Sequence, residues 1–194
     1  MSLDKPKRVI LPKPFEKVMV FIDGGYLRET CKKLYGSDNI EFGYLTLKFI
    51  DFFNDYPYNP FQADLIRIYY YDAIADNRYK NYESQRVYFE SIEDESKYTV
   101  RLGEIIESSK GFKQKGVDIL MSIDAITKAY TDQYSTGIFF MGDRDFVPLI
   151  RAVKEAGKKT LGVFCETNSA KELIRTFDMR VYLGEITLKS LLKK

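Results

Sequence analysis

Residues 137–149 have the sequence Gly-Ile-Phe-Phe-Met-Gly-Asp-Arg-Asp-Phe-Val-Pro-Leu, an apolar run that ends in Gly-Asp-x-Asp. The run between Gly137 and Gly142 is typical of a buried strand in a parallel sheet. Apolar residues then follow at helical spacings. Asp143 and Asp145 therefore stand where a strand passes into a helix. Open α/β sheets bind their ligands at this end of their strands, so these two carboxylates are candidates for chemistry.

The rest of the chain alternates strand and helix patterns around this stretch. Strands are expected over residues 17–22, 65–71, 98–106, 138–141, 160–165 and 180–183. Helices are expected over residues 26–35, 44–53, 78–95, 117–130, from 145 onward, 169–177 and 186–192, with a basic loop over 108–116. This alternation predicts an α/β domain with a mainly parallel central sheet and helices on both faces.

The composition indicates one core domain without a membrane-spanning segment. The 194 residues suffice for one substantial core. Residues 1–16 hold three prolines and are expected to form an arm, while residues 17–194 form the domain. No apolar run approaches the roughly 18 residues that span a bilayer, and no secretory signal is expected. Cys31 and Cys165 show no CxxC spacing, so the cytoplasm is the expected location.

Histidine is absent from the sequence, and this narrows the chemistry. The absence excludes Ser-His-Asp and Cys-His nucleophiles and the common His-ligated zinc sites. Hydrolysis would have to depend on carboxylates, lysine or tyrosine, or on a metal held by oxygen ligands. The formal net charge of +2 is too small to identify a nucleic-acid partner by itself.

Acidic residues follow several of the predicted strands. Asp23 comes after the first strand, Asp72 after the second, and Asp143 after the strand in residues 137–149. The carboxyl ends of parallel strands meet at one edge, which Asp118 can reach from the first turn of its helix. Carboxylates crowded together raise one another's pKa, and a hard divalent cation such as Mg²⁺ or Mn²⁺ removes that cost. Such an ion can activate water for attack on a phosphoryl group.

Three motifs occur in order along the chain. They are Phe21-Ile22-Asp23-Gly24-Gly25, then Lys115-Gly116-Val117-Asp118 with Asp124 after it, then the run from Gly142 to Leu149. Together they resemble the NYN domain, a branch of the PIN-like nuclease superfamily that includes the LabA-like proteins, from about residue 17 to about residue 183. The resemblance implies a single PIN-like domain that is a Mg²⁺- or Mn²⁺-dependent endoribonuclease, with RNA as its partner.

The resemblance also assigns roles to individual residues. It implies that Asp23, Asp118 and Asp143 are metal ligands and catalytic residues. It adds Asp145 as a further catalytic acid and Asp72 as a further metal ligand. The sequence departs from many relatives at two positions, with Tyr26 in place of Asn and Met141 in place of Ser. Neither departure removes a metal ligand.

Five residues beside the motif aspartates are candidates for binding the substrate. Lys115 and Arg144 lie next to these acids in sequence and are suited to contact phosphate. Gly24 and Gly25 allow the backbone to approach phosphate closely, or only allow a tight turn. Tyr26 is the aromatic residue best placed to stack on an unpaired base.

Structural roles compete with these assignments at several positions. Asp145 serves equally well as a helix cap, since Asp is favoured there. Asp72 suits a solvated strand end almost as well as a metal site. Asp124 lies six residues after Asp118, on a different side of the helix, and is expected to form a structural salt bridge.

Two other functions are compatible with the same pattern. One is a non-catalytic RNA- or protein-binding regulatory module that uses the acidic crevice to hold an ion or a partner. The other is a phosphohydrolase of the haloacid dehalogenase type. That type requires Asp-x-Asp after the first strand, and Gly25 occupies the second acidic position here. Assembly into a homo-oligomer is also compatible with the sequence.

Overall fold

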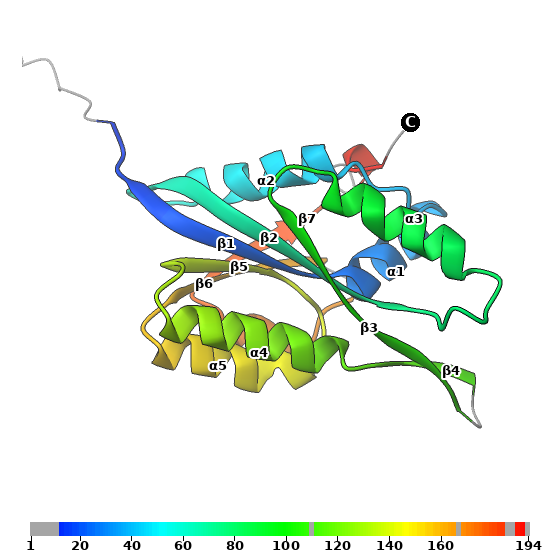
Figure 1. The fold of residues 1–194 in the computed structure, drawn as a ribbon. Helices are drawn as coiled ribbons and strands as arrows, with labels where there is room; N and C mark the ends of the chain where they lie inside the picture. The colour runs from blue at the N-terminus through cyan, green and yellow to red at the C-terminus, as the bar shows by residue number, and fades with distance from the viewer. Residues whose placement is uncertain (1–11, 109–110, 166–167, 185–188, 193–194) are drawn as a thin grey trace, which may run out of the picture.

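One sheet forms the centre of the molecule (Figure 1). The computed structural model describes residues 12–108, 111–165, 168–184 and 189–192. Within these residues seven strands lie in the order β4-β3-β2-β1-β5-β6-β7. They are β1 Phe15–Asp23, β2 Gln62–Ile74, β3 Tyr98–Ser108, β4 Gly111–Lys115, β5 Thr136–Phe140, β6 Lys159–Cys165 and β7 Met179–Leu183. All neighbouring strands are parallel except β3 and β4, so the expected mainly parallel sheet is confirmed.

Helices cover both faces of the sheet, as expected for an α/β domain. They are α1 Gly24–Tyr35, α2 Phe42–Asn54, α3 Tyr82–Glu93, α4 Val117–Tyr130, α5 Val147–Glu155 and α6 Lys171–Thr176, with a short 3₁₀ helix, η1, over Arg144–Phe146. Buried side chains of α1, α2 and α3 belong to one core cluster, and those of α4, α5 and α6 to the other. Figure 1 shows α2 and α3 on one side of the sheet and α4 and α5 on the opposite side.

Strand β1 is buried on both of its faces. Val18, Val20 and Ile22 pack into the core under α1 to α3, whereas Met19 and Phe21 pack into the core under α4 to α6. Successive side chains of a strand point to opposite faces, so both sets have to be apolar. This double burial explains why a continuous apolar run marks the strand in the sequence.

The direction in which the chain builds the sheet reverses between β1 and β5. From β1 the chain enters α1 on one face and continues through β2 toward one border, whereas from β5 it enters α5 on the other face and continues through β6 toward the other border. Ile22 of β1 pairs with Phe140 of β5, so the two strands end side by side. Ligand crevices of open α/β sheets lie at such a reversal.

Two expectations about strands were wrong. Residues 108–116 were expected to be a loop, but Gly111–Lys115 forms β4, which pairs antiparallel with β3. The lysines of this segment favour a loop in the sequence, and Lys110 lies outside the described residues. Strand β2 continues to Ile74, so Asp72 lies inside a strand instead of after it.

The helical expectations differ mainly at their ends. The helix over Val117–Tyr130 is confirmed at both ends. Gly36 ends α1 with φ of 72°, a left-handed conformation that suits glycine. Helix α3 begins at Tyr82 instead of residue 78. The helix expected over 186–192 lies largely outside the described residues, and within those residues no helix is long and apolar enough to cross a membrane.

The two phenylalanines of β1 provide a test of the central core. Phe21 is fully buried, and its ring centroid lies 5.0 Å from that of Phe139. We expect Phe21→Ala to lower the free energy of unfolding by about 3–5 kcal/mol, because it leaves a cavity that the packed sheet cannot fill. Phe15, in the same strand, is 72% exposed, so Phe15→Ala is the matched control and should have little effect. Urea denaturation of both variants measures the difference, and equal losses would contradict the described core.

Candidate active site

Asp23 ends β1 and begins α1. Its Oδ1 accepts a hydrogen bond of 3.0 Å from the backbone N–H of Tyr26, so the side chain caps the helix. Burial raises the pKa of the Asp23 carboxyl to about 7, although the Tyr26 hydrogen bond lowers it. The nearby charges of Asp118, Asp72 and Asp143 also raise this pKa. Asp23 therefore carries a charge that is expensive to keep in its position.

Asp143 and Asp145 lie in the turn after β5. Asp143 Oδ1 accepts a hydrogen bond of 3.0 Å from the backbone N–H of Asp145 and caps η1. Helix capping was predicted for Asp145, but the capping residue is Asp143. The side chain of Asp145 is exposed, and its charge is close enough to raise the pKa of Asp118.

Asp118 lies in the first turn of α4. The residue that begins this helix, Gly116, has φ of 87°, a left-handed conformation that strains residues with side chains. Burial raises the pKa of the Asp118 carboxyl, and the charges of Asp143 and Asp145 raise it as well. The positive end of the α4 dipole partly offsets the cost of this negative charge.

Asp23, Asp118 and Asp143 share one cleft. The cavity has a volume of about 650 Å³ and lies at the carboxyl ends of β1 and β5. Its other lining residues are the acids Glu29 and Asp38, the bases Arg28 and Lys32, and Gly25, Tyr26, Gln114, Gly142 and Asn168. Five acids and two bases make the cleft negatively charged, so it would repel a phosphate without a bound cation.

The chemistry of the donor set fits a hard divalent cation. Carboxylate oxygens are the ligands that Mg²⁺ and Mn²⁺ prefer, and the repulsion that raises the pKa of Asp23 is a cost that such an ion relieves. In the part of the chain that the structure describes, no three His, Cys, Asp or Glu side chains are arranged to hold an ion. The three aspartates thus line one cleft but do not form a complete coordination sphere.

Asp72 forms a buried ion pair with Arg28. The Asp72 side chain is fully buried, and its oxygens accept hydrogen bonds from Arg28 Nε at 2.9 Å and Nη2 at 2.8 Å. The Tyr70 hydroxyl at 3.2 Å, the Ala73 N–H at 2.8 Å and Gln114 Nε2 at 3.4 Å also donate to it. These contacts hold Arg28 at the cleft. The role of Asp72 as a metal ligand stays a prediction.

The Tyr26 side chain lies in a structural position that the sequence did not suggest. Its ring is 9% exposed and packs against Phe140, with ring centroids 5.2 Å apart. Its hydroxyl lies 2.6 Å from Ser169 Oγ and accepts a hydrogen bond of 3.1 Å from the backbone N–H of Cys165. Both contacts tie α1 to the end of β6. Most of the ring is covered by the core although Tyr26 lines the cleft, and its role in stacking on a base stays a prediction.

The two glycines after Asp23 have different surroundings. A Cβ on Gly24 would come within 2.3 Å of the Tyr70 ring, so Gly24 permits close packing of α1 on β2. Gly25 lines the cleft, and a Cβ there would lie 3.4 Å from Asp23 Oδ1. Of the two, Gly25 is the one placed to approach a ligand.

The two predicted phosphate-binding residues lie at the margin of the site. Lys115 is exposed at the end of β4 and does not line the cleft. Arg144 is exposed in η1, and its Nε forms an ion pair of 2.9 Å with Glu172 of α6. Neither side chain lines the cleft of the aspartates, and the role of both in binding the substrate stays a prediction.

Asp124 has the structural role expected for it. Its carboxylate accepts hydrogen bonds from Arg101 Nε at 3.0 Å, the Tyr71 hydroxyl at 3.2 Å and Lys128 Nζ at 3.3 Å. These donors anchor α4 on β2 and β3. The predicted salt bridge is confirmed.

Sequence reasoning missed several residues of the cleft. Arg28 and Lys32 are four residues apart in the helix that follows Asp23, and residues four apart share a helix face, so a signal that they lie together was present. Gln114 was not predicted, because its segment was expected to be a loop. Asn168 reaches the cleft only through the tertiary structure, where the N–H of Ala170 donates to the Gly142 carbonyl at 2.9 Å.

Comparison with protein families accounts for this combination of fold and motifs. Residues 17–184 match the model of the NYN domain. The chain belongs to the NYN family. NYN domains fall within the PIN-like nuclease superfamily, whose members generally use divalent metal ions. The acidic cleft of this NYN domain lies where its three motifs meet.

Two similar proteins are themselves uncharacterised. An uncharacterized protein of Methanocaldococcus jannaschii is 31% identical over 81 residues, which cover 40% of this chain and 34% of that protein. The match therefore spans about a third of the length of this relative. The crystal structure of a protein of unknown function from Vibrio parahaemolyticus superposes with a TM-score of 0.65 and 20% identity, covering 91% of this chain and 98% of that one. This likeness shows that the two proteins share a fold.

The pKa of Asp23 predicts how the stability of the metal-free NYN domain depends on pH. The folded state keeps the Asp23 proton up to about pH 7, whereas an unfolded chain loses it near 3.8. Between these values the folded state binds more protons, so the contribution of Asp23 to stability falls as pH rises. Asp23→Asn removes the charge and can keep the helix cap. In excess chelator, we expect this variant to exceed the parent in free energy of unfolding by more than about 1 kcal/mol above pH 7. The gap should close toward pH 4, and a gap that does not vary with pH would contradict the assignment.

The Arg28–Asp72 pair can be compared with an exposed pair of the same type. Arg28→Gln leaves the Asp72 carboxylate buried without its cation, and we expect a loss of about 3 kcal/mol in the free energy of unfolding. Arg78 and Asp76 form a similar ion pair of 2.8 Å on the surface, so Arg78→Gln is the matched control and should cause no measurable loss. Thermal and urea denaturation test both variants, and equal stability would show that the Arg28 contact is not structural.

Proposed function

We propose that this NYN domain is a Mg²⁺- or Mn²⁺-dependent ribonuclease with its site in the cleft of Asp23, Asp118 and Asp143. The supporting observation is the concentration of negative charge at the reversal between β1 and β5, where burial and neighbouring carboxylates raise the pKa of Asp23 to about 7. Among the described residues, none of these three aspartates forms an ion pair with a basic side chain. The charge and the oxygen donors of the cleft therefore suit a hard divalent cation.

Different residues of the cleft would have different roles in phosphodiester hydrolysis. When bound, a divalent cation supplies a Lewis acid that activates water and stabilises charge on the phosphoryl oxygens. Asp23, Asp118 and Asp143 would hold it, and Asp145 is the proposed further acid beside Asp118. Asp72 fixes the guanidinium of Arg28, whose side chain is 29% exposed and lines the cleft, and which is suited to donate to a phosphate oxygen.

The choice of RNA rests on the family, because NYN nucleases suggest an RNA substrate. The main features of the cleft agree with a polyanionic substrate that arrives with or after the cation. Arg28 and Lys32 lie one helical turn apart at its border, where they can contact successive phosphates. Two free, buried cysteines are compatible with action in the cytoplasm.

One observation favours a second candidate function. The acids within the described ranges are not arranged to hold an ion, which suits a non-catalytic RNA- or protein-binding module. Such a module would bind RNA with the same affinity in chelator and in Mg²⁺ or Mn²⁺. It would leave the RNA intact in both.

Asp143 provides the sharpest test of the ribonuclease. We expect Asp143→Asn to lower the rate of Mn²⁺- or Mg²⁺-dependent cleavage of labelled RNA by at least about 100-fold, since it removes a ligand charge. Asparagine caps helices as well as aspartate does, so the fold and thermal stability should be kept. Asp64→Asn is the matched control, because Asp64 is an exposed aspartate near the N-terminal end of β2, at the edge of the sheet opposite to the cleft.

The assay distinguishes the two candidates directly. The parent and Asp64→Asn should cleave RNA in either metal and stop in excess chelator. Cleavage by Asp143→Asn at the parental rate would rule out the proposed site. Intact RNA in every sample, together with metal-independent binding, would instead establish the recognition module.

A further inference from the structure

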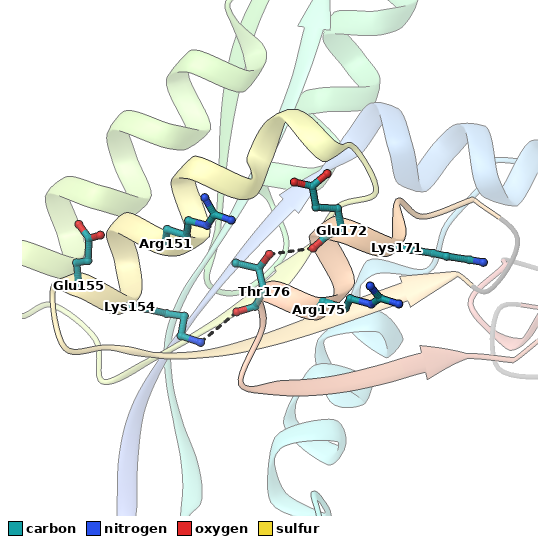
Figure 2. Close-up of a pocket in the computed structure, with 7 residues that line it drawn as sticks. All are labelled: Arg151, Lys154, Glu155, Lys171, Glu172, Arg175 and Thr176. Carbon is teal, nitrogen blue, oxygen red and sulfur yellow. Dashed lines mark hydrogen bonds between the residues drawn. The ribbon is translucent and has the colours of Figure 1, made fainter.

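A basic groove lies between α5 and α6 (Figure 2). Its volume is about 790 Å³, and its lining residues are Arg151, Lys154, Glu155, Lys171, Glu172, Arg175 and Thr176. Four of these side chains are basic and two are acidic, which is the reverse of the balance in the carboxylate cleft. The groove therefore favours an anionic ligand.

Most of the positive charge in the groove is available to a ligand. Lys154 is neutralised by Asp178, since Nζ and Oδ1 lie 2.7 Å apart. Figure 2 shows Lys154 directed toward the main chain of Thr176 instead of outward. The other three basic side chains are exposed, and among the described residues they form no ion pair; they are Arg151, Lys171 and Arg175.

Two of these three cations repel each other on α6. Lys171 and Arg175 are four residues apart on α6, so their like charges lie on one face and weaken the helix. Arg151 faces the same groove from α5. Three unpaired positive charges carried by two neighbouring helices suit a chain of phosphates, which presents one negative charge per unit.

Two contacts connect the segments that line the groove and the carboxylate cleft. Gly142 and Asn168 line the cleft. Arg144, two residues after Gly142, forms an ion pair of 2.9 Å with Glu172, which lines the groove. The N–H of Ala170 donates to the Gly142 carbonyl at 2.9 Å and so holds the two segments together. A strand that leaves the cleft over Arg144 therefore enters the groove.

We infer that the α5–α6 groove binds the phosphate backbone of an RNA strand whose scissile bond lies in the carboxylate cleft. This inference rests on the proposed ribonuclease function and adds the path of the substrate to it. The cleft is acidic and cannot attract a polyanion by its own side chains, whereas the groove supplies that attraction beside it. Phosphate contacts position a strand without reading its bases. The groove should therefore strengthen the binding of longer strands regardless of their sequence.

The test compares two triple variants with the same loss of charge. The groove variant replaces Arg151, Lys171 and Arg175 with Gln. The control variant replaces Lys48, Lys80 and Arg86 with Gln, on and beside α2 and α3 across the sheet. Each set is placed in the Asp143→Asn background, and fluorescence anisotropy measures binding of labelled RNA strands of about 4 and about 16 nucleotides over a range of salt concentrations.

The groove variant should lose affinity only for the long strand. We expect a loss on the order of 100-fold at about 0.1 M salt, with the slope of log affinity against log salt less negative by about 2, as three phosphate contacts predict. The control variant should keep both the affinity and the slope. If the groove variant binds the long strand as tightly as the control variant does, or loses affinity equally for both lengths, the inference is overturned.

Cleavage measured in parallel separates this inference from the proposed function. With Asp143 restored, the groove variant should cleave the short strand at the parental rate and the long strand more slowly at limiting protein. If the parent cleaves neither strand, the ribonuclease proposal fails, and the binding data still decide whether the groove holds RNA. Polyglutamate serves as a second probe. A groove variant that loses polyglutamate but keeps the long RNA would assign the groove to an acidic protein and overturn the RNA assignment.

Discussion

The parallel pairing of β1 with β5 is the constraint on which the site depends. It brings the ends of these two strands to the same height, so Asp23 and the turn that holds Asp143 face one crevice. The helices that follow leave toward opposite faces of the sheet, and this keeps the crevice open. Asp118 enters from the start of α4, where Gly116 permits the sharp change of direction. The sheet therefore imposes the repulsion among these carboxylates, and the surrounding core maintains it.

Acidic and basic side chains are concentrated in two separate regions of the surface. Around the aspartates, acids outnumber bases, and Arg28, one of the two bases that line the cleft, is already paired with the buried Asp72. In the groove between α5 and α6, basic side chains outnumber acidic ones. The Arg144–Glu172 ion pair lies between the two regions. A polyanion and a cation can thus be accommodated side by side in regions that favour each of them.

The residues of the site could be predicted from the sequence to different extents. Asp23 and Asp143 could be found because buried parallel strands have continuous apolar patterns and their ends must meet, whereas Asp118 was predicted chiefly from its motif at the start of a helix. Arg28 and Gln114 could not be placed with the same ease, because their positions depend on an ion pair between α1 and β2 and on a hairpin whose lysines resemble a loop. The covered ring of Tyr26 depends on hydrogen bonds to β6, which no local pattern encodes.

The antiparallel strand β4 has a consequence beyond the residue it contributes to the cleft. It is the last strand at one border of the sheet, and Figure 1 shows its hairpin extending past the helices. A border strand offers free main-chain groups to which another molecule could add a strand, and such additions lead to aggregation. Lys113 and Lys115 are exposed along β4, and their charges oppose that pairing. The same short segment thus protects the protein from intermolecular sheet growth.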